Sequence, residues 1–197
     1  MLTRTFCHVP GIGKETERAL WQDGCDSWEC FLSKPDAYSV GTASRELTCH
    51  ILEQSISALR ELDHQFFRPL LGNDEAWRAW PEFRDSCVYL DIETDGGQSG
   101  SSVTTIGLFD GSEFKCLVKG DNLGNFLDEI SKYSMVVTFF GSGFDLPMLQ
   151  KCFKGHRFDQ IHLDLCYALR KLGYKGGLKK IEQQVGISRA EDTVGLS

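Results

Sequence analysis

The sequence predicts an α/β protein with a mixed β-sheet, in which an antiparallel three-strand meander joins parallel strands with flanking helices, behind a small all-helical N-terminal segment. Two observations predict this class. Apolar residues follow a helical period in the first part of the chain, whereas short strand-like segments begin near residue 87 and then alternate with helical ones. We therefore divide the chain into a helical segment, 1–63, a connector, 64–82, and an α/β domain, 83–197.

The N-terminal segment is predicted to be helical throughout. A first helix covers Lys14–Gln22 between two glycines, and a short second helix is capped by Asp26, with Glu29 three residues further on. A longer helix covers Ala43–Leu62, where leucine and isoleucine recur along one stripe. The connector contains two prolines and two tryptophans, and we expect it to pack against a neighbouring element.

The α/β domain is predicted to begin with the meander, because an Asp-Gly hairpin turn separates its second and third strands. Strands and helices then alternate, which is typical of parallel strands with crossover helices. The expected elements are strands at Cys87–Thr94, Thr104–Asp110 and Glu113–Val118, a helix around Asn122–Ser131, a buried strand at Met135–Phe140, and helices from Leu146, Leu165 and Leu178.

The composition restricts the classes of function. The 197 residues are 41% hydrophobic, which is enough for one sizeable core and a smaller helical unit. No stretch approaches the roughly 18 apolar residues that cross a bilayer, and the chain begins with no secretory signal, so we expect a cytoplasmic protein without a membrane partner. The net charge of −7 argues against indiscriminate coating of nucleic acid, although residues 146–180 are locally basic.

Two carboxylates alternate on the first predicted strand. Asp91 and Glu93 lie two residues apart and therefore project from the same face, opposite the apolar residues between them. Two adjacent like charges destabilise each other unless a cation lies between them. Oxygen ligands at this spacing suit Mg²⁺ or Mn²⁺, while the alternative is a strand end that exposes two acids without a function.

A third carboxylate follows the buried strand at 135–140. Asp145 comes after Gly141-Ser142-Gly143-Phe144 and just before Pro147, an arrangement that predicts a tight turn and the start of a helix. The carboxylate of Asp145 can therefore interact with the helix dipole alone, or it can point across the sheet edge toward the first pair of acids.

These residues together resemble motifs one and two of the DEDD exonucleases. Asp91-Ile92-Glu93-Thr94 is similar to the first motif, and Phe144-Asp145 with Pro147 is similar to the second. The chain most closely resembles the YprB-like ribonuclease H-like family, and the similarity covers most of residues 77–195. The regions that carry it are Trp77–Phe83, Tyr89–Thr94, Val137–Leu149, His162–Leu165 and Gly176–Glu182.

The resemblance implies a ribonuclease H-like fold and a 3′→5′ exonuclease that uses one or two Mg²⁺ or Mn²⁺ ions. Asp91, Glu93 and Asp145 would be both the catalytic and the metal-ligating acids, with Asp91 bridging two ions. The substrate would be DNA or RNA, entering as a single-stranded 3′ end.

The sequence departs from the family pattern at two places. The second motif commonly carries Asn where Phe140 stands, so a polar contact is either missing or supplied by Ser142. No Tyr or His precedes an Asp by four residues after Asp145, so the third motif is absent. The resemblance implies that a further helical region carries this motif, and we therefore expect the α/β domain to be truncated at its C-terminus.

Two aspartates are the possible substitutes for the missing fourth carboxylate. Asp164 is expected to serve chiefly as the N-cap of the helix that follows it, and Asp192 lies near the end of the chain. His162, close to the first of them, could act as a base, but an orienting or core role is the expected one.

The N-terminal segment also has a feature of nucleic-acid-binding proteins. His8-Val9-Pro10-Gly11-Ile12-Gly13-Lys14 before a helix resembles the hairpin of a helix-hairpin-helix motif. Gly11 and Gly13 would let the backbone approach a phosphate and Lys14 would add a cation, whereas the alternative is an ordinary turn between two helices. Lys175 and Lys179 are further candidate contacts within the basic C-terminal region.

Three hypotheses of function follow. The first is a metal-dependent nuclease acting on phosphodiester bonds. The second is an inactive nucleic-acid-binding or adaptor protein that keeps the ribonuclease H-like fold without the third motif. The third is a structural interaction domain in which the acids are incidental.

Overall fold

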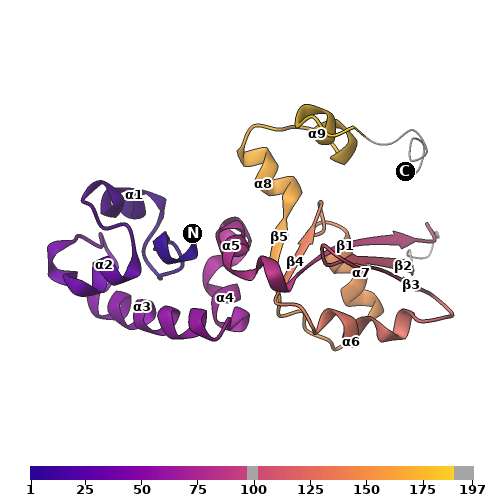
Figure 1. Ribbon diagram of the computed structural model, residues 1–197, viewed down its shortest axis with the longest axis horizontal. Coiled ribbons are helices and arrows are strands. Elements are labelled where there is room, and N and C mark those ends of the chain that lie inside the picture. The colour runs from indigo at the N-terminus through magenta and orange to yellow at the C-terminus, as the bar shows by residue number, and fades with distance from the viewer. Residues whose placement is uncertain (97–101, 189–197) are drawn as a thin grey trace.

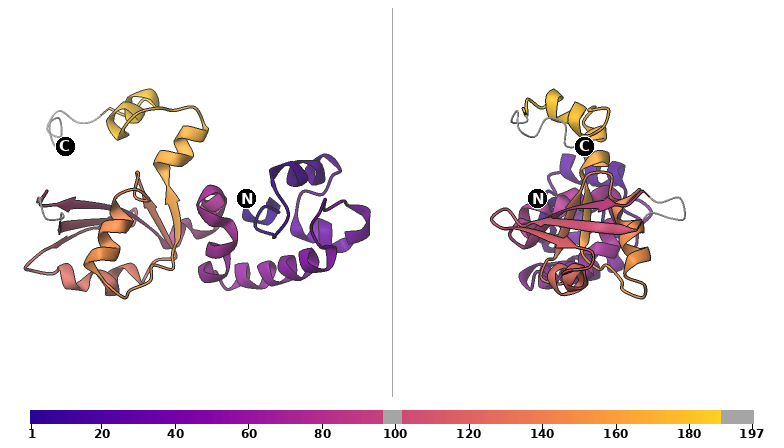
Figure 2. Two further views of the ribbon diagram at one scale, coloured as in Figure 1. Left: turned by 180° about the vertical axis from the view of Figure 1, so that it is seen from behind. Right: turned by 90° about the vertical axis from the view of Figure 1, so that its right-hand side faces the viewer.

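The computed structural model describes residues 1–96 and 102–188, and it is an α/β structure with an N-terminal helical region. Figures 1 and 2 show the helical region and the β-sheet side by side along the long axis of the molecule. The last two helices, α8 and α9, extend from the end of strand β5. In the described part of the chain, no helix is both long enough and apolar enough to cross a membrane.

Within residues 1–96 and 102–188, the sheet has five strands in the order β3-β2-β1-β4-β5. Strand β1 pairs with β2 antiparallel and with β4 parallel, so the sheet is mixed, as the sequence predicts. The hairpin between β2 and β3 turns at Asp110, whose backbone N–H donates to the carbonyl of Glu113. The strands are β1 Cys87–Thr94, β2 Val103–Phe109, β3 Phe114–Val118, β4 Met135–Thr138 and β5 Ile161–Asp164.

Strand β5 was not predicted from the sequence. It has four residues, of which Ile161, Leu163 and Asp164 are buried and His162 is partly buried. A segment this short carries too little periodicity to be distinguished from a loop. It becomes a strand because β4 provides hydrogen-bonding groups along its parallel edge.

The N-terminal helices are α1 Lys14–Gln22, α2 Trp28–Ser33 and α3 Arg45–Arg60, close to the predicted ranges. The predicted cap of α2 was wrong by one residue. The side chain of Ser27 accepts a hydrogen bond from the N–H of Cys30, while Asp26 instead pairs with Arg4 at 3.1 Å. Either residue suits the role by type, so the backbone geometry decided between them.

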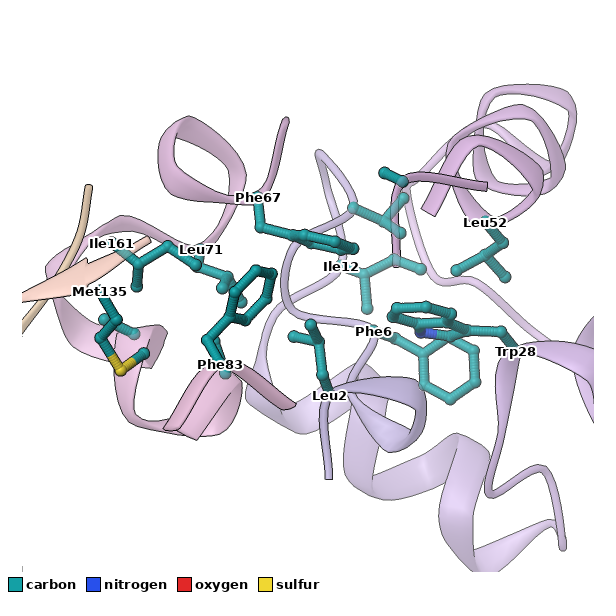
Figure 3. Packing of buried hydrophobic residues seen from close by; sticks show 14 of the residues in the cluster. Leu2, Phe6, Ile12, Trp28, Leu52, Phe67, Leu71, Phe83, Met135 and Ile161 are labelled. Atoms are coloured by element: carbon teal, nitrogen blue, oxygen red, sulfur yellow. The ribbon is translucent and has the colours of Figure 1, made fainter. Parts of the chain in front are cut away.

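The segment after α3 is helical and packs against the sheet. Helix α4 is His64–Glu75, with a break at Gly72 (φ 58°), and α5 is Trp80–Phe83. Phe67 and Leu71 of α4 belong to one buried cluster that continues from Trp28 in the helical region to the strands (Figure 3). The strand residues in this cluster are Cys87, Met135, Val137, Ile161 and Leu163.

A second buried cluster covers the opposite face of the sheet. Helices α6 Phe126–Ile130 and α7 Asp145–Cys152 pack here against the apolar residues of β1 and β2. Val88, Leu90 and Ile92 point into this cluster, so the residues between them point to the other face of the sheet. The remaining helices are α8 Leu165–Lys171 and α9 Leu178–Gln184. All eight cysteines lie in the described residues and are free thiols.

Candidate functional site

Asp91 and Glu93 project from the face of β1 that the second cluster leaves uncovered, as the alternation of the strand predicts. Both residues are exposed. Partial desolvation, and then the charge of Glu93, raise the pKa of Asp91 above its usual value. The charge of Glu93 therefore disfavours the ionised form of Asp91, and no ion pair with a cation relieves this among the described residues.

The loop after β4 requires two glycines. A Cβ at Gly141 would lie 2.2 Å from Oγ1 of Thr138, and a Cβ at Gly143 would lie 2.6 Å from the ring of Phe140. Neither distance is possible for a real side chain, so these positions admit only glycine without rearrangement. The tight turn that results delivers Asp145 to the first position of α7.

Asp145 is a buried acid, with only 4% of its surface exposed. Burial, followed by the charges of Asp91 and Asp164, raises its pKa from 3.8 to about 6. The electrostatic influence of Asp91 on this group places the second motif beside the first, as the resemblance implies. A buried carboxyl group with a raised pKa and no paired cation is typical of a functional site rather than of a structural one.

The three acids line one open groove of about 900 Å³. Its other walls are aromatic and basic. Phe139, Phe140 and Phe144 come from the loop before α7, and α9 contributes the segment 177–180, which includes Lys179 and Lys180. The groove therefore places acids, exposed rings and cations within one space, a combination that suits a ligand with phosphates and flat bases.

The described residues contain no group of three or more His, Cys, Asp or Glu side chains arranged to hold a metal ion as they stand. Carboxylate oxygens that line one groove are nevertheless the type of donor that a hard cation requires. Mg²⁺ is commonly bound by one or two carboxylates, with water and substrate phosphates completing its shell. Asp91 with Glu93 or with Asp145 fits such a partial site.

Asp164 is engaged by the loop. Its carboxylate accepts hydrogen bonds from the backbone N–H groups of Phe140 at 2.8 Å, Ser142 at 3.0 Å and Cys166 at 3.1 Å. The last of these bonds confirms the predicted N-cap of α8. Asp164 therefore fixes the shape of the loop that carries Asp145, and it is not among the residues that line the groove.

The sequence model of the RNase H superfamily matches residues 88–197, which is more than half of the chain. This chain belongs to the RNase H superfamily. No curated protein sequence matches it. The mixed sheet with its flanking helices agrees with a ribonuclease H-like fold.

Two solved structures are similar to parts of this RNase H superfamily chain. The family B DNA polymerase of the archaeon Pyrobaculum calidifontis is 14% identical, with a TM-score of 0.43, over 54% of this chain and 19% of the polymerase. The EXO domain of Nibbler from Aedes aegypti is 14% identical, with a TM-score of 0.36, over 51% of this chain and 53% of that domain.

Ser142 and His162 do not line the groove of the three acids in this RNase H superfamily domain. Nε2 of His162 is 2.9 Å from Oγ1 of Thr138, and burial lowers the pKa of the imidazole. Ser142 and His162 line a separate cavity of about 380 Å³ together with Arg68 of α4. Asp192 lies outside the described residues, so the structure does not place it.

The predicted N-terminal phosphate contacts lie in the helical region that precedes the RNase H superfamily match. Gly11 has a φ of 88°, and a Cβ there would lie 3.1 Å from Cβ of Ala43, while Gly13 is the N-cap of α1. Nζ of Lys14 pairs with Oε1 of Glu75 at 2.8 Å. Lys14, which was expected to contact a phosphate, is therefore engaged in an ion pair within the protein.

A buried ion-pair network explains that pairing, and the sequence offered no signal for it. Arg78 binds Glu17 at 2.7 Å and Glu75 at 2.5 Å, and both acids are almost fully buried. Glu17 also accepts hydrogen bonds from residues at the N-terminus of the chain, Thr5, Phe6 and Cys7. The network joins α1 to the segment after α4 across 61 residues of sequence.

The two predicted contacts in the C-terminal region, Lys175 and Lys179, have different environments. Lys179 lines the groove that contains the three acids. The backbone carbonyl of Lys175 accepts a hydrogen bond from the side chain of Gln184 at 2.9 Å, which ties the α8–α9 loop to α9. The exposed aromatic rings of the groove were not predicted, because an apolar run in a sequence does not distinguish exposed rings from core residues.

Proposed function

We propose that this chain is a divalent-metal-dependent nuclease that hydrolyses phosphodiester bonds of DNA or RNA in the 3′→5′ direction. The observation that carries the proposal is the convergence of Asp91, Glu93 and Asp145 on one groove, where the charge of Asp91 adds to the burial that raises the pKa of Asp145. Membership of the RNase H superfamily supports a nuclease-type function. The direction of cleavage rests on the resemblance to DEDD exonucleases.

The protein's own residues would act by position and charge. Asp91, Glu93 and Asp145 would hold one or two Mg²⁺ or Mn²⁺ ions, which supply hydroxide and stabilise the displacement at phosphorus in a two-metal mechanism. Asp164 would act indirectly, because its hydrogen bonds hold the loop that positions Asp145. Lys179 would attract the phosphates of a single-stranded 3′ end into the groove.

The helical segment and the connector would assist the binding of the strand. The helical segment 1–63 would hold the nucleic-acid backbone through its helix-hairpin-helix-like turn, and 64–82 would connect it to the exonuclease domain, 83–197. Gly13 has open space around it, which supports the approach of a phosphate to this turn. A cytoplasmic location stays a prediction from the sequence.

A second candidate function is a nucleic-acid-binding or adaptor protein without catalysis. One observation favours it. The described residues that line the groove include three acids, and Asp164, one of the two aspartates predicted to supply the fourth carboxylate, uses both of its oxygens to bind the loop. A site that lacks a fourth carboxylate would bind a second metal ion weakly.

Degradation of 3′- and 5′-labelled single-stranded DNA and RNA separates the two functions. The assay compares the unaltered chain with Asp91→Ala in the presence of Mg²⁺, Mn²⁺ or EDTA, and uses Asp128→Ala, a change of an exposed acid on α6, as the matched control. Metal-dependent shortening from the 3′ end, lost only in Asp91→Ala, would support the nuclease. Strand binding without cleavage by any variant would favour the adaptor.

A further inference from the structure

Phe140 adopts a backbone conformation that large side chains rarely accept. Its φ is 65°, in the left-handed region, which costs a residue with a Cβ roughly 1–2 kcal/mol. The other described non-glycine residue with a positive φ is Leu62, which follows the C-cap of α3, where a left-handed residue commonly ends a helix. Phe140 follows a strand, so no helix end explains its conformation.

Burial does not explain it either. Phe140 as a whole residue is 43% exposed, and Phe144 in the same loop is 42% exposed. An apolar ring stabilises a fold in proportion to the area that it removes from water, and this ring leaves much of its area in contact with solvent. The backbone strain is therefore not offset by complete packing in the core.

The loop is nevertheless shaped around this ring. Gly143 lies against it so closely that a Cβ would stand 2.6 Å away, and Tyr167 of α8 is a neighbour with ring centroids 6.3 Å apart. The backbone N–H of Phe140 is anchored by Asp164 at 2.8 Å. The guanidinium of Arg170 lies 5.6 Å from the ring of Tyr167 and extends the aromatic surface with a cation. The ring is thus held in place while part of it stays open.

Phe140 faces the groove of the acids. It lines that groove together with Asp91, Asp145 and Lys179. A flat ring, held from behind and open to a space that also offers cations and metal-ligating acids, matches the base, sugar and phosphate of one nucleotide. Base stacking on an aromatic side chain is tolerant of sequence, and it requires a base whose face is not covered by a neighbour in a duplex.

We propose that Phe140 is a platform on which an unpaired terminal nucleobase stacks, so that the chain selects single-stranded ends. The proposal rests on the proposed function only for the presence of a nucleic-acid strand in the groove. It predicts that affinity depends on the base itself and not only on the phosphates. Removal of an aromatic side chain on which one base stacks weakens binding of the strand roughly 5- to 100-fold.

The test changes residue 140 in the protein and one base in the ligand, separately and together, and compares the affinities. Binding of short fluorescent single-stranded DNA is measured by anisotropy on an Asp91→Asn background, so that the strand is not consumed. The strand carries either normal nucleotides or one abasic residue at the 3′ end, at the 5′ end or in the middle. Each strand is titrated against the Asp91→Asn chain and against the same chain with Phe140→Asn, because Asn tolerates the left-handed conformation and has no ring.

Two further variants isolate the ring from size and strain. Phe140→Tyr keeps an aromatic face and Phe140→Leu keeps an apolar side chain with the same backbone cost. We expect the terminal abasic residue to weaken binding roughly 5- to 30-fold in the chains with Phe or Tyr, and by less than about twofold in the chains with Asn or Leu. An abasic residue in the middle of the strand should have no such coupling to residue 140.

Equal penalties for the abasic end in all four chains, or no strand binding at all, would overturn the platform. The cleavage assay gives a separate answer on the nuclease. Metal-dependent cleavage without base coupling would retain the nuclease and reject the platform. Base coupling without cleavage would retain the platform and reject the nuclease. Thermal melting of each variant checks that the fold is intact.

Discussion

Replacing Asp145 by Asn should stabilise the fold at neutral pH while removing a metal ligand. The pKa of Asp145 is raised from 3.8 to about 6, so the folded state disfavours the ionised carboxylate. One pKa unit corresponds to about 1.4 kcal/mol, and a shift of about two units therefore costs about 3 kcal/mol once the group is ionised. Asn has the same shape and no charge, but its amide group needs a hydrogen-bond acceptor, so we expect a net gain of about 2 kcal/mol.

The stabilisation of the fold by Asp145→Asn should depend on pH. Because the folded pKa is above the unfolded one, the penalty is absent below the unfolded pKa of 3.8 and complete above the folded pKa of about 6. Urea unfolding of the two chains at pH 7.5 and 4.5, without divalent ions, should show the advantage of Asp145→Asn shrinking by about 2 kcal/mol at the lower pH. Asp128→Asn, at an exposed position on α6, should change the free energy of unfolding by less than about 0.5 kcal/mol at both values.

Two outcomes would refute this reasoning. If Asp145→Asn is less stable than the unaltered chain at pH 7.5, the carboxylate is not under the electrostatic cost inferred from its burial. If the difference is the same at pH 7.5 and pH 4.5, the effect of the substitution comes from packing and not from charge.

Three further predictions concern the metal, the ion-pair network and the loop. Thermal melting should show that Mg²⁺ or Mn²⁺ raises the Tm of the unaltered chain but not that of Asp91→Ala, because binding to the folded state alone stabilises it. Arg78→Met should lower the free energy of unfolding by about 3–5 kcal/mol, since it removes the ion pairs of Arg78 with two buried carboxylates, Glu17 and Glu75. Arg84→Met, at an exposed ion pair, should change it by less than about 1 kcal/mol, and equal losses in urea unfolding would contradict this. Gly143→Ala should weaken strand binding and cleavage at least about tenfold, because a misplaced loop displaces catalytic groups. The control is Gly124→Ala, at a position where a Cβ meets nothing within 4 Å. Equal activities of the two variants would show that the loop accommodates a side chain at position 143.

The local elements of the fold could be predicted from the sequence because local patterns produce them. The range predicted for the strand at Cys87–Thr94 agrees with the structure, and so does the range for the helix at Lys14–Gln22. Strand β5 could not be predicted, because it has only four residues and exists by pairing with β4. The cap of α2 depended on which of two suitable neighbours adopted the capping geometry, and Ser27 did so instead of Asp26.

Part of the candidate site could also be predicted. The spacing of Asp91 and Glu93 on a strand was sufficient to place them on one face, and the Gly-rich turn placed Asp145 at a helix start. Asp164 caps α8 and also holds the loop after β4. The second role could not be predicted from the sequence, because its partners in the loop are more than 20 residues away.

The sequence alone determined the alternation of strands and helices, the acids that share a strand face and the glycines that allow the turn, since each follows from backbone geometry over a few residues. Only the tertiary structure decided which groups are buried together. Packing of α7 against the sheet raises the pKa of Asp145 beside Asp91, and Phe140 stays partly exposed next to Tyr167 of α8. Burial and electrostatic interaction depend on neighbours in space, and the chain brings these neighbours together only when it folds.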